Sequence, residues 1–335
     1  MLKVAVIGCG AVGLTTALCL QEKLGNGATI QIFTTKVSPN TTSDIAAGLW
    51  EPLVHTSESS EDKIIKWGLC TYKFIINLWK EGYAKNAGIV LQPVIKVTED
   101  PNFIPPQWLK YTLGFSVLSK DYLKKLSKDT NHNFAAGIQF VSFTWEASTF
   151  LPYLQKQFLQ KGGQIINKTI EDLDKLNDFD VIVNCTGIGA AKLLQDTHVF
   201  PIRGQIARVA APWLFSSICV DNNYIIPNTN CVILGGTKQR EYNTQVYAID
   251  TQHILKGCMN IVPSLETADI IKEQVGLRPG RTELRLELEL RNIKGKMVRV
   301  LHNYGHGGSG ITLSIGCAMD AVDLILKSIL SNSKL

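Results

Sequence analysis

The sequence has no continuous apolar stretch that approaches the roughly 18 to 20 residues of a membrane span. It also has no basic run with interleaved aromatic residues, and its net charge of +5 over 335 residues is modest. Neither a membrane nor a nucleic acid is therefore an expected partner. The apolar N-terminus lacks a cleavage signal, so we do not interpret it as a signal peptide.

Closely spaced cysteines are also missing, because the eight cysteines are scattered along the chain. This spacing predicts no metal site, and several cysteines lie in apolar runs that are typical of reduced, buried thiols. No Ser/His/Asp or paired-carboxylate constellation stands out either. The 45% of hydrophobic residues is enough to bury a large core, and a chain of this length is expected to form two domains.

A glycine-rich segment near the N-terminus carries the first positive signal. Residues 4–7 form a short apolar run typical of a buried parallel strand, and residues 14–20 continue as a helix. Between them Gly8, Gly10 and Gly13 match the G-x-G-x-x-G dinucleotide fingerprint. In that motif the glycines allow a tight turn, a close pyrophosphate and close packing of helix on strand. The alternative is a plain tight turn between strand and helix.

The second expected strand, at residues 29–33, departs from the fingerprint. It should end in an acidic residue that binds the ribose hydroxyls, yet Thr34, Thr35 and Lys36 follow it. Hydroxyls, backbone groups or water must then contact the ribose. Lys36 would suit an added phosphate, which leaves NADP open as an alternative cofactor.

A second glycine-rich segment lies near the other end of the chain, at residues 302–312. Two such loops at opposite ends favour one long cofactor that is held from two sides. A flavin dinucleotide fits this arrangement better than a nicotinamide cofactor, for which the first loop usually suffices.

The last three residues of the sequence are Ser333, Lys334 and Leu335. At a C-terminus this tripeptide is the address that the peroxisomal import receptor reads. We therefore expect a peroxisomal matrix protein, and peroxisomes house oxidases that produce hydrogen peroxide. A chance ending is the alternative.

The chain resembles the D-amino-acid oxidase and D-aspartate oxidase family of peroxisomal flavoenzymes. The resemblance runs nearly end to end and rests on ordered motifs at residues 6–14, 41–50, 181–187, 201–205, 224–227, 234–237, 276–279 and 302–312.

The resemblance implies an α/β fold, with a Rossmann-like FAD-binding domain and a strand-rich α+β substrate domain. We expect the FAD-binding domain to be discontinuous, with the boundaries 1–55, 145–195 and 275–335. The substrate domain then takes 56–144 and 196–274. The implied FAD-binding residues are Gly8, Gly10, Val12, Gly13, Lys36, Thr41, Thr42, Ser43, Gly48, Leu49, Ile170, Thr186, Gly307, Gly308, Ser309, Gly310, Ile311 and Thr312.

For the substrate, the resemblance implies that Arg278 binds the α-carboxylate, a role that suits its planar bidentate fork. Tyr224 adds a phenolic hydrogen bond, and the carbonyl of Gly308 accepts one from the amine. The implied reaction transfers a hydride to flavin N5 and yields a 2-oxo acid, ammonia and hydrogen peroxide. Arg278 alone would equally suggest a surface ion pair with Glu273 or Glu283.

Substrate choice depends on Lys238, which stands where D-aspartate oxidases resemble one another in carrying a basic residue. A buried side-chain carboxylate needs a counter-charge, so Lys238, or less strongly Arg240, favours acidic D-amino acids such as D-aspartate and D-glutamate. Against this, Val220 replaces the basic residue expected shortly before Tyr224. Three alternatives stay open: neutral D-amino acids as substrates, a solvated Lys238, and a flavin-binding protein without turnover.

The two histidines of the second glycine segment, His302 and His306, would be candidates for a catalytic base. We interpret both as structural, because the cofactor performs the difficult chemical step.

Overall fold

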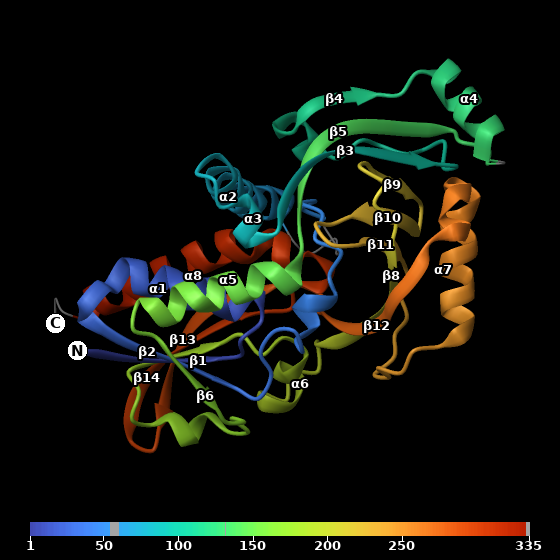
Figure 1. Cartoon of the computed structure of the whole chain (residues 1–335). Helices are drawn as coiled ribbons and strands as arrows, with labels where there is room; N and C mark the ends of the chain where they lie inside the picture. Colours follow the sequence, from blue (N-terminus) through green and yellow to red (C-terminus); the bar gives the residue numbers. More distant parts are fainter. Residues whose placement is uncertain (54–59, 131, 333–335) are drawn as a thin grey trace.

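The computed structural model describes residues 1–53, 60–130 and 132–332. Within these residues the strands form two sheets, one of six strands and one of eight (Figure 1). None of the helices in the described part of the chain combines the length and apolar character needed to cross a membrane.

The six-stranded sheet combines strands from the N-terminal, central and C-terminal parts of the sequence. Its order is β13-β14-β7-β1-β2-β6, and the strands from β14 to β6 pair in parallel while β13 is antiparallel to β14. Val4 and Val6 of β1 are fully buried, as expected for a central parallel strand. The bounds are β1 Leu2–Ile7, β2 Ala28–Thr34, β6 Gln164–Asn167, β7 Val181–Asn184, β13 Arg285–Ile293 and β14 Lys296–Tyr304.

Three long helices pack side by side along this sheet (Figure 1). They are α1 (Ala11–Leu24), α5 (Ala147–Gln160) and α8 (Gly310–Asn332). Their apolar residues share one core with β1, β2 and β7. The helix α2 (Glu61–Lys80) packs on α8, and the one-turn helix α3 (Ala84–Ala87) follows it.

The eight-stranded sheet comes from the middle of the chain, in the order β12-β8-β11-β10-β9-β3-β5-β4. Its pairs are antiparallel except β3 with β9. The helix α7 (Ala248–Ile261) packs on β8, β10 and β11, and α4 (Lys120–Thr130) lies near β5 (Figure 1). The strands are β3 Ile89–Thr98, β4 Leu113–Val117, β5 Ala136–Trp145, β8 Phe200–Ala210, β9 Ser217–Val220, β10 Asn223–Pro227, β11 Val232–Gly235 and β12 Asp269–Gly280.

The remaining helical elements are short. They are α6 (Ala190–Leu193) and the 3-10 turns η1 Gly25–Gly27, η2 Thr42–Ile45, η3 Gln107–Tyr111, η4 Leu173–Leu176, η5 Gly187–Gly189, η6 Pro263–Thr267 and η7 Gly307–Ser309.

The expected α/β class with a strand-rich middle is confirmed. The domain boundaries stay a prediction, which the separation of the strands into two sheets supports. Two strands cross expected boundaries. β5 ends at Trp145, one residue beyond the boundary at 144, and β12 continues to Gly280 because its pairing with β8 does.

Candidate active site

A single cavity of about 850 Å³ is lined by residues of both sheets and of both glycine segments. This volume lies within the range of cofactor and ligand sites. Of the residues expected from the sequence, those that line it are Gly8, Gly10, Val12, Lys36, Thr41, Thr42, Ser43, Gly48, Leu49, Ile170, Thr186, Gly307, Gly308, Gly310, Ile311, Thr312, Tyr224, Lys238 and Arg278.

The first glycine loop joins β1 to α1. Gly8 has a φ of +106°, and a Cβ there would lie 2.5 Å from the carbonyl oxygen of Cys185, so only glycine fits. Gly13 does not line the cavity. A Cβ on it would lie 2.0 Å from the carbonyl oxygen of Gly8, so its role is to let α1 pack closely on the strand.

The segment after β2 covers this loop through side-chain contacts. The hydroxyl of Ser43 accepts a hydrogen bond of 3.1 Å from the backbone N–H of Ala11. Asp44, which is buried, accepts bonds of 2.8 Å and 2.6 Å from the backbone N–H and hydroxyl of Thr41. This capping box holds residues 41–45 in one conformation against the start of α1.

The second glycine segment repeats this arrangement at the start of α8. It follows β14, and Gly307 has a φ of +56°. Gly307 and Gly308 line the cavity together with the first residues of α8. Ser309 does not line it: this residue is buried, and its hydroxyl donates a 3.3 Å hydrogen bond to the carbonyl of Leu53.

Two helix N-termini thus contribute to one cavity, α1 at Gly10 and α8 at Gly310. Backbone N–H groups at such ends attract phosphate and other electron-rich groups. The far part of the wall contains Lys36 and Thr186, whose hydroxyl donates a 2.7 Å bond to Asn184. A long cofactor with a central pyrophosphate therefore fits the residues present.

Tyr224 and Arg278 meet at the end of the cavity that the eight-stranded sheet forms. Glycines make room for both side chains: a Cβ on Gly235 would lie 2.0 Å from the Tyr224 ring, and one on Gly204 would lie 2.2 Å from the guanidinium. The guanidinium donates a 3.0 Å hydrogen bond to the carbonyl of Thr237. Burial raises the pKa of Tyr224, which Arg278 partly opposes, so the phenol stays a hydrogen-bond donor.

Arg278 forms no ion pair with any described carboxylate. Glu273 accepts a hydrogen bond from Thr251 instead, and Glu283 contacts Arg281 through its backbone carbonyl. The surface ion pair that the sequence left open is therefore absent from the described structure. The fork of Arg278 lines the cavity, where it can bind a carboxylate in the bidentate way.

Lys238 lies on the loop that follows β11, and its exposed side chain is part of the cavity wall. Partial desolvation of the ammonium by the cavity wall lowers the pKa of Lys238, and the positive charges of Arg278 and Lys96 lower it further. In the described structure it has no hydrogen-bonded or ion-paired side-chain partner.

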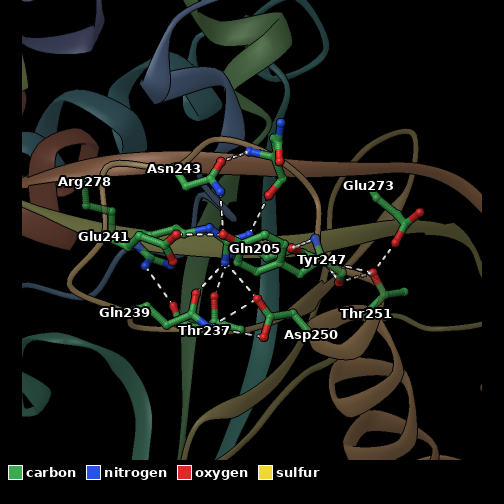
Figure 2. A network of polar contacts seen from close by, with 12 residues as sticks. Gln205, Thr237, Gln239, Glu241, Asn243, Tyr247, Asp250, Thr251, Glu273 and Arg278 are labelled. Atoms are coloured by element: carbon green, nitrogen blue, oxygen red, sulfur yellow. Dashed lines mark hydrogen bonds and ion pairs between the residues drawn. The ribbon is translucent and has the colours of Figure 1, made fainter.

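A buried polar network fixes this loop (Figure 2). The fully buried guanidinium of Arg203 donates a 2.8 Å hydrogen bond to Asp250 and a 3.0 Å hydrogen bond to Gln205. It also contacts the side-chain oxygen of Gln239. The backbones of Arg203 and Gln239 exchange two further bonds of 2.8 Å and 3.0 Å. Because Gln239 is held by backbone and side chain alike, the position of its neighbour Lys238 is fixed.

Sequence reasoning missed two charged residues of this wall, Glu51 and Lys96, which form an ion pair. The side chain of Lys96 is 24% exposed and that of Glu51 is 11% exposed. Glu51 follows the motif at residues 41–50 directly, which was an available signal. Lys96 lies in β3 without any motif around it.

Both histidines of the second glycine segment are buried. Burial lowers the pKa of His306 to about 4, so its ring is neutral near neutral pH. Burial also lowers the pKa of His302, which contacts Asn184 and Glu289. Their burial agrees with our structural interpretation of both.

Comparison with known proteins decides the family. Residues 3–324 match the family model described as FAD dependent oxidoreductase. A D-aspartate oxidase from Homo sapiens is 36% identical over 329 residues, which cover 96% of this chain and 94% of the relative. The chain belongs to the D-amino-acid oxidase and D-aspartate oxidase family.

A second relative and a solved structure also resemble this chain. A D-amino acid oxidase from Dugesia ryukyuensis is 36% identical, and the match covers 99% of each chain. Among solved structures, glycine oxidase from Geobacillus kaustophilus superimposes with a TM-score of 0.77 at 19% identity, over 98% of this chain and 95% of the other. That structure supports the fold.

These findings confirm the predictions of an FAD-dependent oxidase and of oxidative deamination of D-amino acids. They favour FAD over NADP and turnover over passive flavin binding. Relatives of both names match at the same identity, so they do not separate acidic from neutral substrates. No group of three or more His, Cys, Asp or Glu residues able to hold a metal occurs in the described part of the chain.

Proposed function

We propose that this oxidase prefers acidic D-amino acids, D-aspartate and D-glutamate, over neutral ones. One observation supports the proposal: Arg278 and Lys238 line the same end of the cavity, and neither pairs with a described carboxylate. An α-carboxylate accounts for one cation. A second carboxylate on the substrate side chain accounts for the other, since uncompensated charges in a low-dielectric site are unfavourable.

In the proposed mechanism the chain binds and orients, and it provides no nucleophile. Arg278 and Tyr224 bind the α-carboxylate, the carbonyl of Gly308 accepts a hydrogen bond from the amine, and Lys238 binds the side-chain carboxylate. Holding the substrate in one orientation lowers the barrier by the entropy paid on binding. The two glycine segments and residues 41–49 would hold FAD, which would supply the hydride acceptor for the oxidation, with molecular oxygen as the co-substrate.

The test compares D-aspartate with D-alanine on the wild-type enzyme and on Lys238→Met. We expect the wild-type enzyme to have a higher kcat/KM for D-aspartate than for D-alanine. In Lys238→Met the kcat/KM for D-aspartate should fall roughly tenfold or more, because KM rises. D-alanine serves as the control and should change little. A wild type that already prefers D-alanine would contradict the proposal.

The second candidate is an oxidase of neutral D-amino acids, which another part of the wall favours. Cys219 and Ile226 line the cavity near Tyr224, and Val220 beside Cys219 is buried and apolar. In that case Lys238 is a solvated loop charge, and its replacement leaves the order of substrates unchanged.

We also propose that the peroxisomal import receptor reads Ser333, Lys334 and Leu335. This proposal rests on the sequence, because these residues lie outside the described part of the chain. A fluorescent protein fused to the N-terminus should reach peroxisomes. Replacing Leu335 with Asp should leave the fusion in the cytosol, and unchanged targeting would contradict the proposal.

A further inference from the structure

The ion pair between Lys96 and Glu51 lies in the wall of the substrate end. Register places Lys96 in one row with the substrate-binding tyrosine, because Lys96 pairs with Cys219 and Cys219 pairs with Tyr224. Residues paired directly across strands present their side chains on the same face of a sheet. Lys96, Cys219 and Tyr224 all line the cavity, so this face forms its wall.

The distance along this row suits a small substrate. Neighbouring strands lie about 4.8 Å apart, which puts the Lys96 backbone roughly 10 Å from that of Tyr224. The side chains of Lys96 and Tyr224 project from the same face into one cavity. A group that extends a few atoms from a carboxylate bound at Tyr224 and Arg278 therefore comes within reach of the Lys96 ammonium.

The ammonium of Lys96 also has unused hydrogen-bonding capacity. It carries three N–H donors, and among the described residues Glu51 is its one hydrogen-bond acceptor. Burying an ammonium without further acceptors is costly. An acceptor that enters the cavity would complete its coordination.

The charges at this end are Arg278, Lys238 and Lys96 against Glu51, with the exposed Asp221 at the rim. Asp221 accepts a 2.5 Å hydrogen bond from Thr98. Lys238 is close enough to Lys96 and Glu51 to be affected by both charges. Once Glu51 has offset one cation, the inner wall still carries two positive charges, which match the two carboxylates of an acidic amino acid.

We propose that Lys96, oriented by Glu51, binds the side-chain carboxylate of the substrate together with Lys238. This inference rests on the proposed preference for acidic D-amino acids. It adds a second, independent cation to the site, and it gives Glu51 the role of a positioning residue.

The test uses the FAD-loaded enzyme and two variants, because Lys96→Met alone leaves the Glu51 carboxylate unpaired beside the substrate. The double variant Lys96→Met, Glu51→Gln removes both charges at once. We expect it to lose about tenfold to a hundredfold in kcat/KM for D-aspartate, through KM. D-alanine, which has no side-chain carboxylate, should change little, and the single variant should lose more than the double.

A binding measurement without turnover accompanies the kinetics. Malonate has two carboxylates and no amine, and its binding is followed by the change in flavin absorbance. Its Kd should rise at least about tenfold in the double variant, while the Kd of acetate stays near the wild-type value.

The outcomes separate the two proposals. If the double variant regains wild-type efficiency on D-aspartate and wild-type affinity for malonate, Lys96 only neutralises Glu51 and the inference is wrong, while the preference for acidic substrates stands. If the wild type prefers D-alanine, the acidic preference itself fails. A double variant that loses efficiency on D-aspartate and affinity for malonate, but keeps its efficiency on D-alanine, supports the inference.

Discussion

The two ends of the cavity differ in the groups that form their walls. At the cofactor end the wall includes two glycine segments, and in the first of them a Cβ added to Gly8 or Gly13 would meet a carbonyl oxygen. At the substrate end the wall includes the long charged side chains of Lys96, Lys238 and Arg278, which come from strands and a loop. A binding surface made of backbone has a shape that substitutions change little, so it suits one ligand. Substitutions can replace side chains in a wall without moving the strands that carry them. The comparison teaches that cofactor identity and substrate choice are encoded separately in this fold.

The largest effect is expected at the backbone end, for Gly13→Ala. Alanine normally favours a helix over glycine by about 1 kcal/mol, but here its Cβ would lie 2.0 Å from the carbonyl oxygen of Gly8. We expect a loss of about 4 kcal/mol or more in the free energy of unfolding, with little bound flavin. The ratio of flavin to protein absorbance and the Tm measure both effects. Gly27→Ala is the control, because a Cβ there meets nothing within 4 Å; equal damage at both positions would refute the argument.

At the other end, Arg278→Ala should raise KM steeply for acidic and neutral substrates alike. The loss of a charged bidentate contact costs roughly 3 kcal/mol, which is about a hundredfold in kcat/KM. The flavin spectrum and the flavin content should stay normal. Steady-state kinetics with both substrate classes test this. Arg278→Lys keeps the charge but not the bidentate guanidinium, so its KM should lie between those of the wild type and Arg278→Ala. Unchanged kinetics for Arg278→Ala would show that this residue does not bind the substrate.

A smaller effect follows from pH, which acts on the side-chain end only. Burial, Arg278 and Lys96 lower the pKa of Lys238 from its ordinary value of 10.5. As the pH rises through this lowered pKa the ammonium loses its charge, so the ratio of kcat/KM for D-aspartate to that for D-alanine should fall below pH 10.5. Taking the ratio cancels the titration of the substrate amine. Lys238→Met should make the ratio independent of pH in this range, and a flat wild-type ratio would contradict the assignment.

The smallest effect concerns Asp196, which supports the second glycine segment from outside the cavity. Burial would raise its pKa, but hydrogen bonds from Tyr304, Arg281 and the backbone of His198 lower it to about 2. Because the folded pKa lies below the ordinary value of 3.8, this carboxylate stabilises the fold above about pH 4 and loses that contribution as the pH falls toward 2.

Asp196→Asn should therefore lower the Tm near neutral pH and reduce the drop in Tm between pH 4 and pH 2. Thermal melts across this range measure it. A variant that loses Tm by the same amount at every pH would show that packing, and not the charge of Asp196, is responsible.

The sequence revealed the backbone end far better than the side-chain end. Close backbone packing requires glycine at fixed positions of a short motif, so Gly8, Gly10 and Gly13 were recognisable from their spacing. Lys96 has no such spacing signal, because it is aligned with Tyr224 only through the pairing of β3 with β9 and of β9 with β10, and β3 is distant from the other two in sequence. The strands β12 and β13 were also not predicted. Exposed residues interrupt their apolar pattern, and their extended conformation depends on pairing with β8 and β14.

The strand order of the six-stranded sheet has a consequence for the timing of biosynthesis. β7 lies between β1 and β14, so one edge of this strand has no neighbour until the ribosome has made the segment at residues 296–304. At 5 to 20 residues per second, the roughly 290 residues between β1 and β14 take on the order of 15 to 60 seconds to translate. Throughout that interval the first glycine loop exists without the second. If both segments bind the flavin as proposed, the nascent chain cannot enclose it, and cofactor capture belongs to a late stage, when nearly the whole chain has been synthesised.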